Sequence, residues 1–166
     1  AGALSIPDAE QLQRVLRRGQ PVRMRLVLTP RNIGRRQSGN VIAEVPGTDP
    51  SAGVIVIGGH LDSWDLGTGA IDNAAGVAIT TAAAHRIMQA GRPRRTIRVV
   101  LFGAEEVGVF GGTAYFNAHR NDGNVVLVGE SDFGADRVWR LQTNFGPSNT
   151  ALGDRINALL APLGIV

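Results

Sequence analysis

The stretch VIVIGGHLDSWDLGTGAIDNAAG, residues 54–76, joins a continuous apolar run to a segment crowded with ionisable side chains. The run has the length of a strand, and its unbroken apolar character predicts a strand buried on both faces, as in an α/β sheet. One histidine and three aspartates follow between closely spaced glycines. A strand end does not need so many charged groups for folding alone, so we take this segment as a candidate functional site.

The next 60 residues repeat the pattern of apolar strand and helix. A helix is predicted over residues 74–90, where Gly91 ends it, and a short helix over residues 111–120. Buried strands are predicted in RTIRVVLFGAEE (95–106) and NVVLVGESD (124–132). This alternation predicts an α/β fold with a mixed or mostly parallel sheet covered by helices. Right-handed crossovers then bring the carboxyl ends of the strands to one edge, where open α/β sheets bind ligands.

The flanking segments predict further elements. A short helix is predicted that ends at Gly19. Two strands are predicted after it, one over the alternating residues 22–28 and one over residues 40–45, and they are expected to pair as a β-hairpin or meander. One more strand is predicted over residues 138–143. Ser148 is predicted to cap an amphipathic helix that continues to about residue 161.

Composition limits the class of protein. A length of 166 residues suggests one domain, and the absence of cysteine excludes a disulfide framework and cysteine zinc sites. All 17 basic residues are arginines, and their scattered pairs, without interleaved aromatic residues, indicate a solvated surface rather than a nucleic-acid interface. No apolar run approaches a membrane span, and residues 1–10 lack the features of a signal peptide.

Ionisable side chains follow all three predicted buried strands. They are His60, Asp62 and Asp72 after the first strand, Glu105 and Glu106 after the second, and Glu130 and Asp132 after the third. Such a cluster would repel itself and raise its own pKa values, and no basic residue lies within these segments to neutralise it. A divalent metal ion, or a pair of them, is the simplest remedy. One histidine with several carboxylates suits zinc and, less specifically, manganese or cobalt.

The spacing suggests roles within this cluster. His60 and Asp62 are two residues apart on an extended segment, so Asp62 can accept the second ring N–H of His60 and fix its tautomer. Glu105 and Glu106 are adjacent and point in different directions. One of them can hold metal while the other faces a water molecule and takes its proton, which is a division of labour that suits hydrolysis.

Three segments together resemble the M28 family of zinc exopeptidases and, within it, the carboxypeptidase Q branch. They are GGHLDSWDLGTGAIDNAAG, VVLFGAEEVGVFGG and VGESDFGAD, in this order and spacing. The resemblance implies a three-layer α/β/α sandwich that is incomplete here, with residues 1–21 as an N-terminal helix or linker and residues 22–166 as a partial catalytic domain. The implied activity is hydrolysis of dipeptides or of the end of short peptides, as an aminopeptidase or dipeptidase.

The resemblance also implies roles for individual residues. It assigns four side chains to a pair of zinc ions: His60 and Asp132 to one ion, Glu106 to the other, and Asp72 as the bridge between them. Glu105 is implied as the general base that then protonates the leaving amine, and Asp62 as the residue that orients His60. The peptide bond after the bridging aspartate is often cis in this family, so a cis bond is expected between Asp72 and Asn73. Glu130 receives no role.

One expected ligand is absent from the sequence. In the family the second zinc takes a further histidine downstream of the ESD segment, and no histidine follows His119 here. We therefore expect the chain alone to hold at most one zinc ion well and to be weakly active or inactive. For the full-length protein, the resemblance implies a secreted or periplasmic location and allows a homodimer.

Two alternatives stay open. The first is a non-catalytic metal-binding or interaction domain on the same fold, and the presence of Glu105 argues against it because such a domain has no need of a base. The second is an acyltransferase with a single zinc, similar to glutaminyl cyclases. The combination of Asp72, the Glu105–Glu106 pair and the ESD segment favours the two-metal hydrolase.

Overall fold

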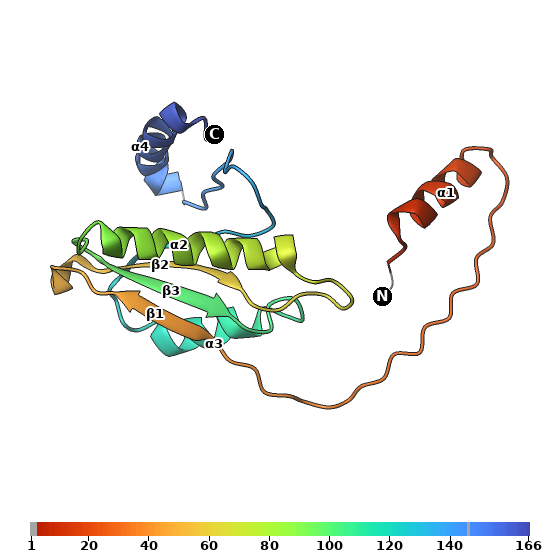
Figure 1. The fold of residues 1–166 in the computed structure, drawn as a ribbon, viewed down its shortest axis with the longest axis horizontal. Coiled ribbons are helices and arrows are strands. Elements are labelled where there is room, and N and C mark those ends of the chain that lie inside the picture. Colours follow the sequence, from red (N-terminus) through yellow and green to blue (C-terminus); the bar gives the residue numbers. More distant parts are fainter. Residues whose placement is uncertain (1–2, 146) are drawn as a thin grey trace. The chain divides into compact units, whose positions relative to one another are not determined.

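The structure is a computed structural model that describes residues 3–145 and 147–166, and it divides into two units. The first unit extends to Arg36 and contains helix α1 (Ile6–Leu16), whose N-terminus is capped by the Ser5 hydroxyl. The second unit, Gln37–Val166, contains the sheet and every residue predicted to form the site (Figure 1). Within the described residues, no helix combines the length and the apolar content that crossing a bilayer requires.

The second unit is built on a four-stranded mixed sheet. Its strands are β1 (Val41–Val45), β2 (Val54–His60), β3 (Thr96–Phe102) and β4 (Val125–Glu130), in the spatial order β1-β3-β2-β4. Strands β3 and β4 both run parallel to β2, whereas β1 is antiparallel to β3. The β-branched residues that fill β2 and β3 favour this pleated, buried setting. The predicted mixed, mostly parallel sheet is confirmed.

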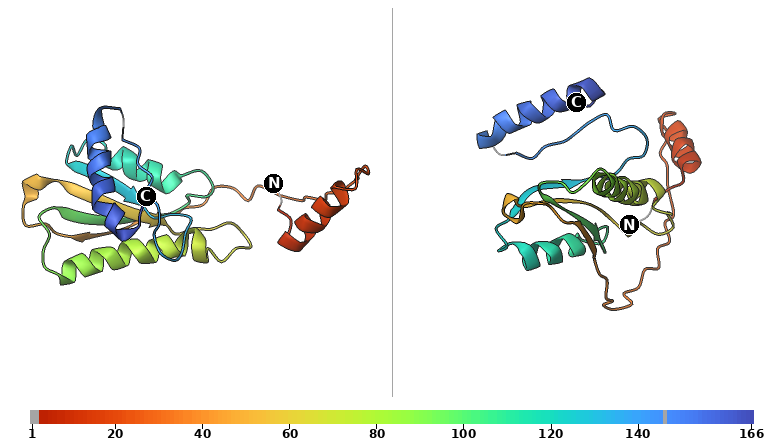
Figure 2. Two further views of the ribbon diagram at one scale, coloured as in Figure 1. Left: turned by 90° about the horizontal axis from the view of Figure 1, so that it is seen from above. Right: turned by 60° about the vertical axis from the view of Figure 1, so that its left-hand side comes forward.

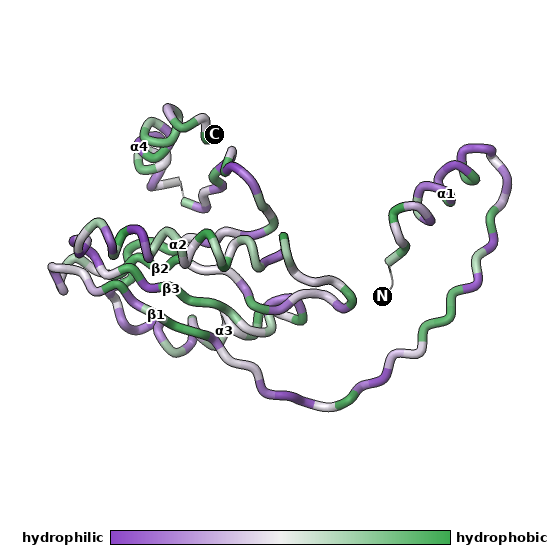
Figure 3. The backbone as a smooth tube through the Cα atoms, viewed as in Figure 1, coloured by the Kyte–Doolittle hydropathy of each residue, from purple (hydrophilic) through white to green (hydrophobic). Residues whose placement is uncertain are grey.

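Helices cover both faces of this sheet, as the two views of Figure 2 show. On one face α2 (Ala75–Gln89) packs Ala84 and Ile87 against apolar residues of β1 and β3. On the other face α3 (Phe110–His119) packs Tyr115 against a cluster of three valines in β2 and β3. The hydrophobic stretches of the central strands therefore lie between two helical layers (Figure 3). This is the expected three-layer α/β/α arrangement.

The connections place a topological switch at the end of β2. From β2 the chain passes through α2 to β3 on one side of β2, and from β3 it passes through α3 to β4 on the other side. The carboxyl ends of three parallel strands therefore lie at one edge, and the strand order reverses beside His60. Open α/β sheets bind their ligands at such a point.

The predicted hairpin of residues 22–28 and 40–45 is wrong. Residues 22–28 form no strand, and β1 pairs instead with β3, where Val45 lies opposite Ile97 and is buried. Alternation of apolar and polar residues fits a half-buried strand, but a strand also needs a partner. For β1 that partner is more than 50 residues away in the sequence.

Three further differences concern the C-terminal part of the chain. Strand β4 is at the sheet edge and is exposed along its length, although its apolar run predicted a buried strand. Residues 138–143 form no strand, and only two backbone hydrogen bonds link Trp139 and Leu141 to Val166. Helix α4 (Thr150–Leu160) follows a 3-10 turn over Pro147–Asn149, so its N-cap residue is Asn149 rather than Ser148.

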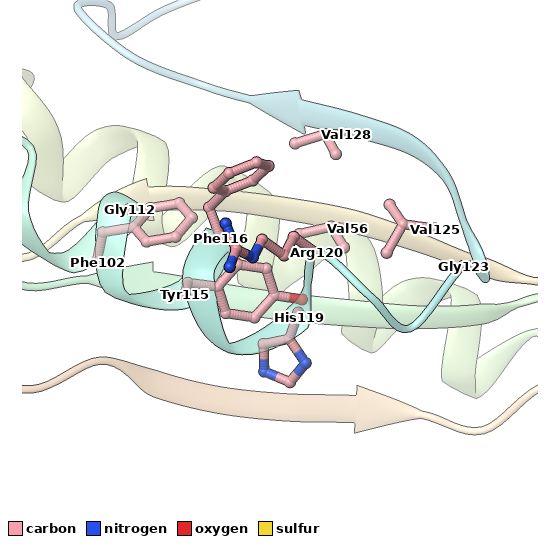
Figure 4. A pocket seen from close by; sticks show the side chains of 10 residues that line it. All are labelled: Val56, Phe102, Gly112, Tyr115, Phe116, His119, Arg120, Gly123, Val125 and Val128. Carbon is pink, nitrogen blue, oxygen red and sulfur yellow. The ribbon is translucent and has the colours of Figure 1, made fainter.

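An apolar cavity of about 440 Å³ lies between α3 and strands β2 and β4. Its walls include Tyr115 and Phe116 from the helix and Val56, Val125 and Val128 from the strands (Figure 4). Val125 and Val128, which line this cavity, are therefore not covered by α3. None of the predicted site residues lines it.

Candidate metal centre

His60 is the last residue of β2 and the most deeply buried member of the cluster, with 1% of its surface exposed. Its Nδ1 atom lies 2.9 Å from the backbone carbonyl oxygen of Asp62. A carbonyl can only accept, so Nδ1 carries the proton and donates this bond. The other ring nitrogen, Nε2, faces the carboxylates of the neighbouring strand ends and is the nitrogen that can bind a metal ion.

Carboxylates from all three strand ends surround this nitrogen. The distances from His60 Nε2 are 3.0 Å to Asp72 Oδ1, 3.5 Å to Asp132 Oδ1 and 3.9 Å to Glu105 Oε2. Glu106 completes the group, because ligand atoms of His60, Asp72 and Glu106 all lie within 4.8 Å of one another. The structure thus brings together the residues that the sequence placed at separate strand ends.

This donor set fits a zinc ion. One neutral imidazole nitrogen and several carboxylate oxygens are ligands that zinc takes in proteins, at about 2.0–2.2 Å. Around a tetrahedral ion, such bonds put neighbouring ligand atoms about 3.4 Å apart. The contacts of 3.0 and 3.5 Å around Nε2 are already close to this spacing. The group that includes Glu106 is looser, with donor atoms within 4.8 Å of one another.

The backbone at the start of α2 places Asp72. A π-type turn over Ala70–Ala74 precedes the helix, and Asp72 has a non-helical backbone within it. The Asp72–Asn73 peptide bond is cis, as the resemblance led us to expect. Asn73 is 1% exposed, and its side-chain oxygen accepts the N–H of Gly76, 3.1 Å away. The first turn of α2 is therefore tied to the residue after Asp72.

Asn73 and Gly76 are positioning residues that the sequence reasoning missed. A Cβ atom at Gly76 would overlap both the Ser131 carbonyl oxygen and the Asn73 side chain. Only glycine lets the segment after β4, which carries Asp132, pass this close to the start of α2. The sequence feature that could have indicated them is an asparagine directly after Asp72, followed three residues later by a glycine, at the N-terminus of a predicted helix.

Asp62 lies at the site, but its carboxylate makes a different contact from the predicted one. Its Oδ1 atom is 3.7 Å from His60 Nδ1, whereas its backbone carbonyl oxygen is the 2.9 Å acceptor. The carboxylate oxygens accept the backbone N–H groups of Glu105 and Glu106 at 2.9 and 3.1 Å. The imidazole is therefore oriented by the backbone of Asp62, and the Asp62 side chain holds the Glu105–Glu106 pair.

The crowding of charge shifts pKa values in the expected direction. Burial lowers the pKa of His60, but the hydrogen bond to Asp62 and the charges of Asp132 and Glu105 outweigh it, so this pKa lies above its usual range. Loss of hydration, followed by the charge of Asp72, raises the pKa of Glu106. In the absence of metal, His60 and Glu106 therefore hold their protons to higher pH than isolated side chains do, as expected where negative charges are crowded together.

Glu130 provides a test of these pKa shifts, since it is not among the proposed metal ligands. Partial burial, followed by the charge of Asp132, raises its pKa. A carboxyl group whose pKa is raised by folding lowers the free energy of unfolding as the pH rises from its unfolded-state pKa to its folded-state pKa. Below the unfolded-state pKa it has no effect on stability. We expect Glu130→Gln to stabilise the metal-free protein at pH 7 and to have no effect at pH 3. The gain should be less than about 1 kcal/mol, because the side chain is only partly buried and solvent screens its charge.

Urea unfolding of the two proteins at both pH values measures this difference. Asp154→Asn removes one charge from an exposed residue of α4 and serves as the control. Equal effects of the two substitutions, or a larger effect of Glu130→Gln at pH 3 than at pH 7, would contradict the raised pKa of Glu130.

Comparison with known proteins places this site in context. The sequence profile described as Peptidase family M28 matches residues 40–165, which include the whole cluster. Carboxypeptidase Q of Xenopus laevis is 36% identical over 165 residues, covering 98% of this chain and 35% of that protein. Carboxypeptidase Q of Homo sapiens is 35% identical over 164 residues, with the same coverage of each chain.

A solved structure shows the same fold. The crystal structure of a peptidase M28 precursor from Shewanella amazonensis SB2B matches with a TM-score of 0.69 and 43% sequence identity, covering 76% of this chain and 29% of that chain. The chain spans about a third of the length of the curated relatives it matches, 35% in both examples.

Proposed function

Because the chain belongs to peptidase family M28, we propose that its strand-end cluster hydrolyses peptide bonds in dipeptides or at the end of short peptides, with zinc as cofactor. The observation that carries this proposal is the convergence of three ligand atoms, from His60, Asp72 and Glu106, within 4.8 Å of one another. They meet at the carboxyl edge of the sheet, beside a further carboxylate that is free to act as a base.

The four ligand side chains would divide between a pair of zinc ions. His60 and Asp132 would hold one ion, Glu106 the other, and Asp72 would bridge them. Bound zinc supplies Lewis acidity toward the peptide carbonyl and toward a water molecule. No histidine follows His119 in this chain, so the ion at Glu106 has no imidazole ligand from that part of the sequence. We expect this chain to bind the ion at His60 more tightly, and alone to be weakly active.

Glu105 would perform the proton transfers. Its carboxylate is 3.9 Å from His60 Nε2 and its side chain is 30% exposed, so it borders the metal ligands and also reaches solvent. In this position it can take a proton from the attacking water and deliver it to the departing amine. His60 keeps Nε2 directed at the cluster because its Nδ1–H is bonded to the Asp62 carbonyl.

Space for a substrate side chain lies beside the ligands. A hollow of about 340 Å³ is lined by Asp72 and Glu106 together with Trp64, Ile71 and small residues of the same loop. Its wall is mainly apolar, which suits an apolar side chain adjacent to the bond that is cleaved. We propose that short peptides bind here.

Removal and return of zinc test the proposed function. Zinc-loaded protein is expected to release free amino acids from dipeptides, to lose this activity on treatment with a chelator, and to regain it when zinc is added back. Free amino acids can be quantified by derivatisation and chromatography. Zinc binding without any release of amino acids would contradict peptidase activity of this chain by itself.

A further inference from the structure

The Asp62 carboxylate makes one hydrogen bond through each of its oxygens, and both go to the same turn. Oδ1 accepts the N–H of Glu105 at 2.9 Å, and Oδ2 accepts the N–H of Glu106 at 3.1 Å. The two partners follow β3, more than 40 residues from Asp62 in the sequence. This contact therefore links the loop after β2 to the loop after β3, directly behind the metal ligands.

The turn that receives these bonds needs external support. Ala104, just before the pair, has a φ of 54°, in the left-handed region that costs a residue with a Cβ about 1 kcal/mol. On the far side, the Glu105 carbonyl accepts the N–H groups of Gly108 and Val109 at 2.9 and 2.7 Å. Such conformations persist where the surroundings hold them in place. Here the carboxylate holds the N–H side and the start of α3 holds the carbonyl side.

We propose that the side chain of Asp62 positions the Glu105–Glu106 pair, while its backbone carbonyl holds the His60 ring. Its carboxylate fixes two consecutive backbone N–H groups, and this fixes the directions in which the two side chains leave the backbone. Glu106 then lies within the ligand group, while Glu105 lies beside it, 3.9 Å from His60 Nε2. The consequence for catalysis rests on the proposed function, but the contact itself does not depend on it.

The chemistry of asparagine separates the two roles of Asp62. A carboxylate presents two acceptor oxygens, whereas an amide presents one acceptor and one donor group. Asp62→Asn can therefore satisfy only one of the two N–H groups, and Asp62→Ala neither. The acceptor for His60 is the backbone carbonyl of Asp62, which both variants retain. The matched control is Asp65→Asn, which removes the same charge from the same loop.

Amide hydrogen exchange, measured by NMR on the metal-free chain, tests the proposal. In Asp62→Ala we expect the Glu105 and Glu106 amides to exchange at least about tenfold faster, which corresponds to one lost hydrogen bond each. In Asp62→Asn one of the two amides should show this acceleration. The His60 ring nitrogen shifts should keep the same tautomer in both variants, and Asp65→Asn should change neither measurement.

Unchanged exchange at both amides, or loss of the His60 tautomer with both amides still protected, would overturn the proposal. If circular dichroism shows that Asp62→Ala does not fold, the Asp62→Asn comparison decides alone. Zinc affinity is a second readout, expected to fall about 10- to 100-fold in Asp62→Ala. A wild-type chain that binds no zinc would refute the proposed function while leaving the exchange result valid.

Discussion

Replacing Glu105 with glutamine is expected to lower kcat for dipeptide hydrolysis by about 10²- to 10⁴-fold, the usual contribution of a general base, while the bound zinc content stays unchanged. Glutamine has the same shape but cannot take a proton from water. Glu105 lies beside the ligand group without belonging to it, since that group is formed by His60, Asp72 and Glu106. Steady-state kinetics combined with metal analysis of the same sample measures both quantities.

The adjacent residue supplies a matched control. Glu106→Gln makes the same chemical change one position further on, but at a proposed metal ligand, so it should lower zinc content as well as activity. Full activity in Glu105→Gln would remove this residue from the mechanism. If zinc were lost in Glu105→Gln and kept in Glu106→Gln, the assignment of base and ligand within the pair would be reversed.

Replacing Asp72 with asparagine is expected to weaken zinc binding by more than about 100-fold, the upper end of the loss seen when only an outer partner of a ligand is changed. The Asp72 carboxylate is the nearest to His60 Nε2, at 3.0 Å, and it is the proposed bridge between the two ions. Asparagine keeps the size and the turn but removes the charge. Competition with a chromophoric chelator measures the affinity.

Asp65→Asn serves as the control for charge, because Asp65 lies in the same loop and outside the ligand group. Its zinc affinity should match that of the unmodified chain. An equal loss in the two variants would mean that zinc responds only to the overall negative charge of the loop. Unchanged affinity in Asp72→Asn would exclude this residue as a ligand.

The central part of the fold and the convergence of the ionisable residues at one sheet edge were predictable from the sequence. Residues 54–60 form a continuous apolar run, which is the pattern of a strand buried between helical layers, and β2 occupies this range. The helix after Asn73 follows from the alanine-rich segment that ends before Gly91. Once the strands are parallel, topology alone brings their carboxyl ends together, so the ionisable residues after β2, β3 and β4 had to converge.

Features that depend on long-range partners were not predictable. The pairing of β1 with β3 and the edge position of β4 depend on which strands meet, and apolar alternation does not encode this. Because His60 and Asp62 are two residues apart, the sequence suggested the Asp62 carboxylate as the acceptor of the imidazole N–H. The structure shows the Asp62 backbone carbonyl in that role. The true partners of the Asp62 carboxylate follow a different strand, and only the assembled sheet places them within hydrogen-bond distance.

Equilibrium dialysis of the metal-free chain against zinc, followed by elemental analysis, tests the proposed metal centre most directly. We expect one zinc ion per chain to stay bound, and this ion to be lost in His60→Ala because the only imidazole in the ligand group is removed. A chain that retains no more zinc than the His60→Ala variant, with both proteins folded, would contradict the metal centre.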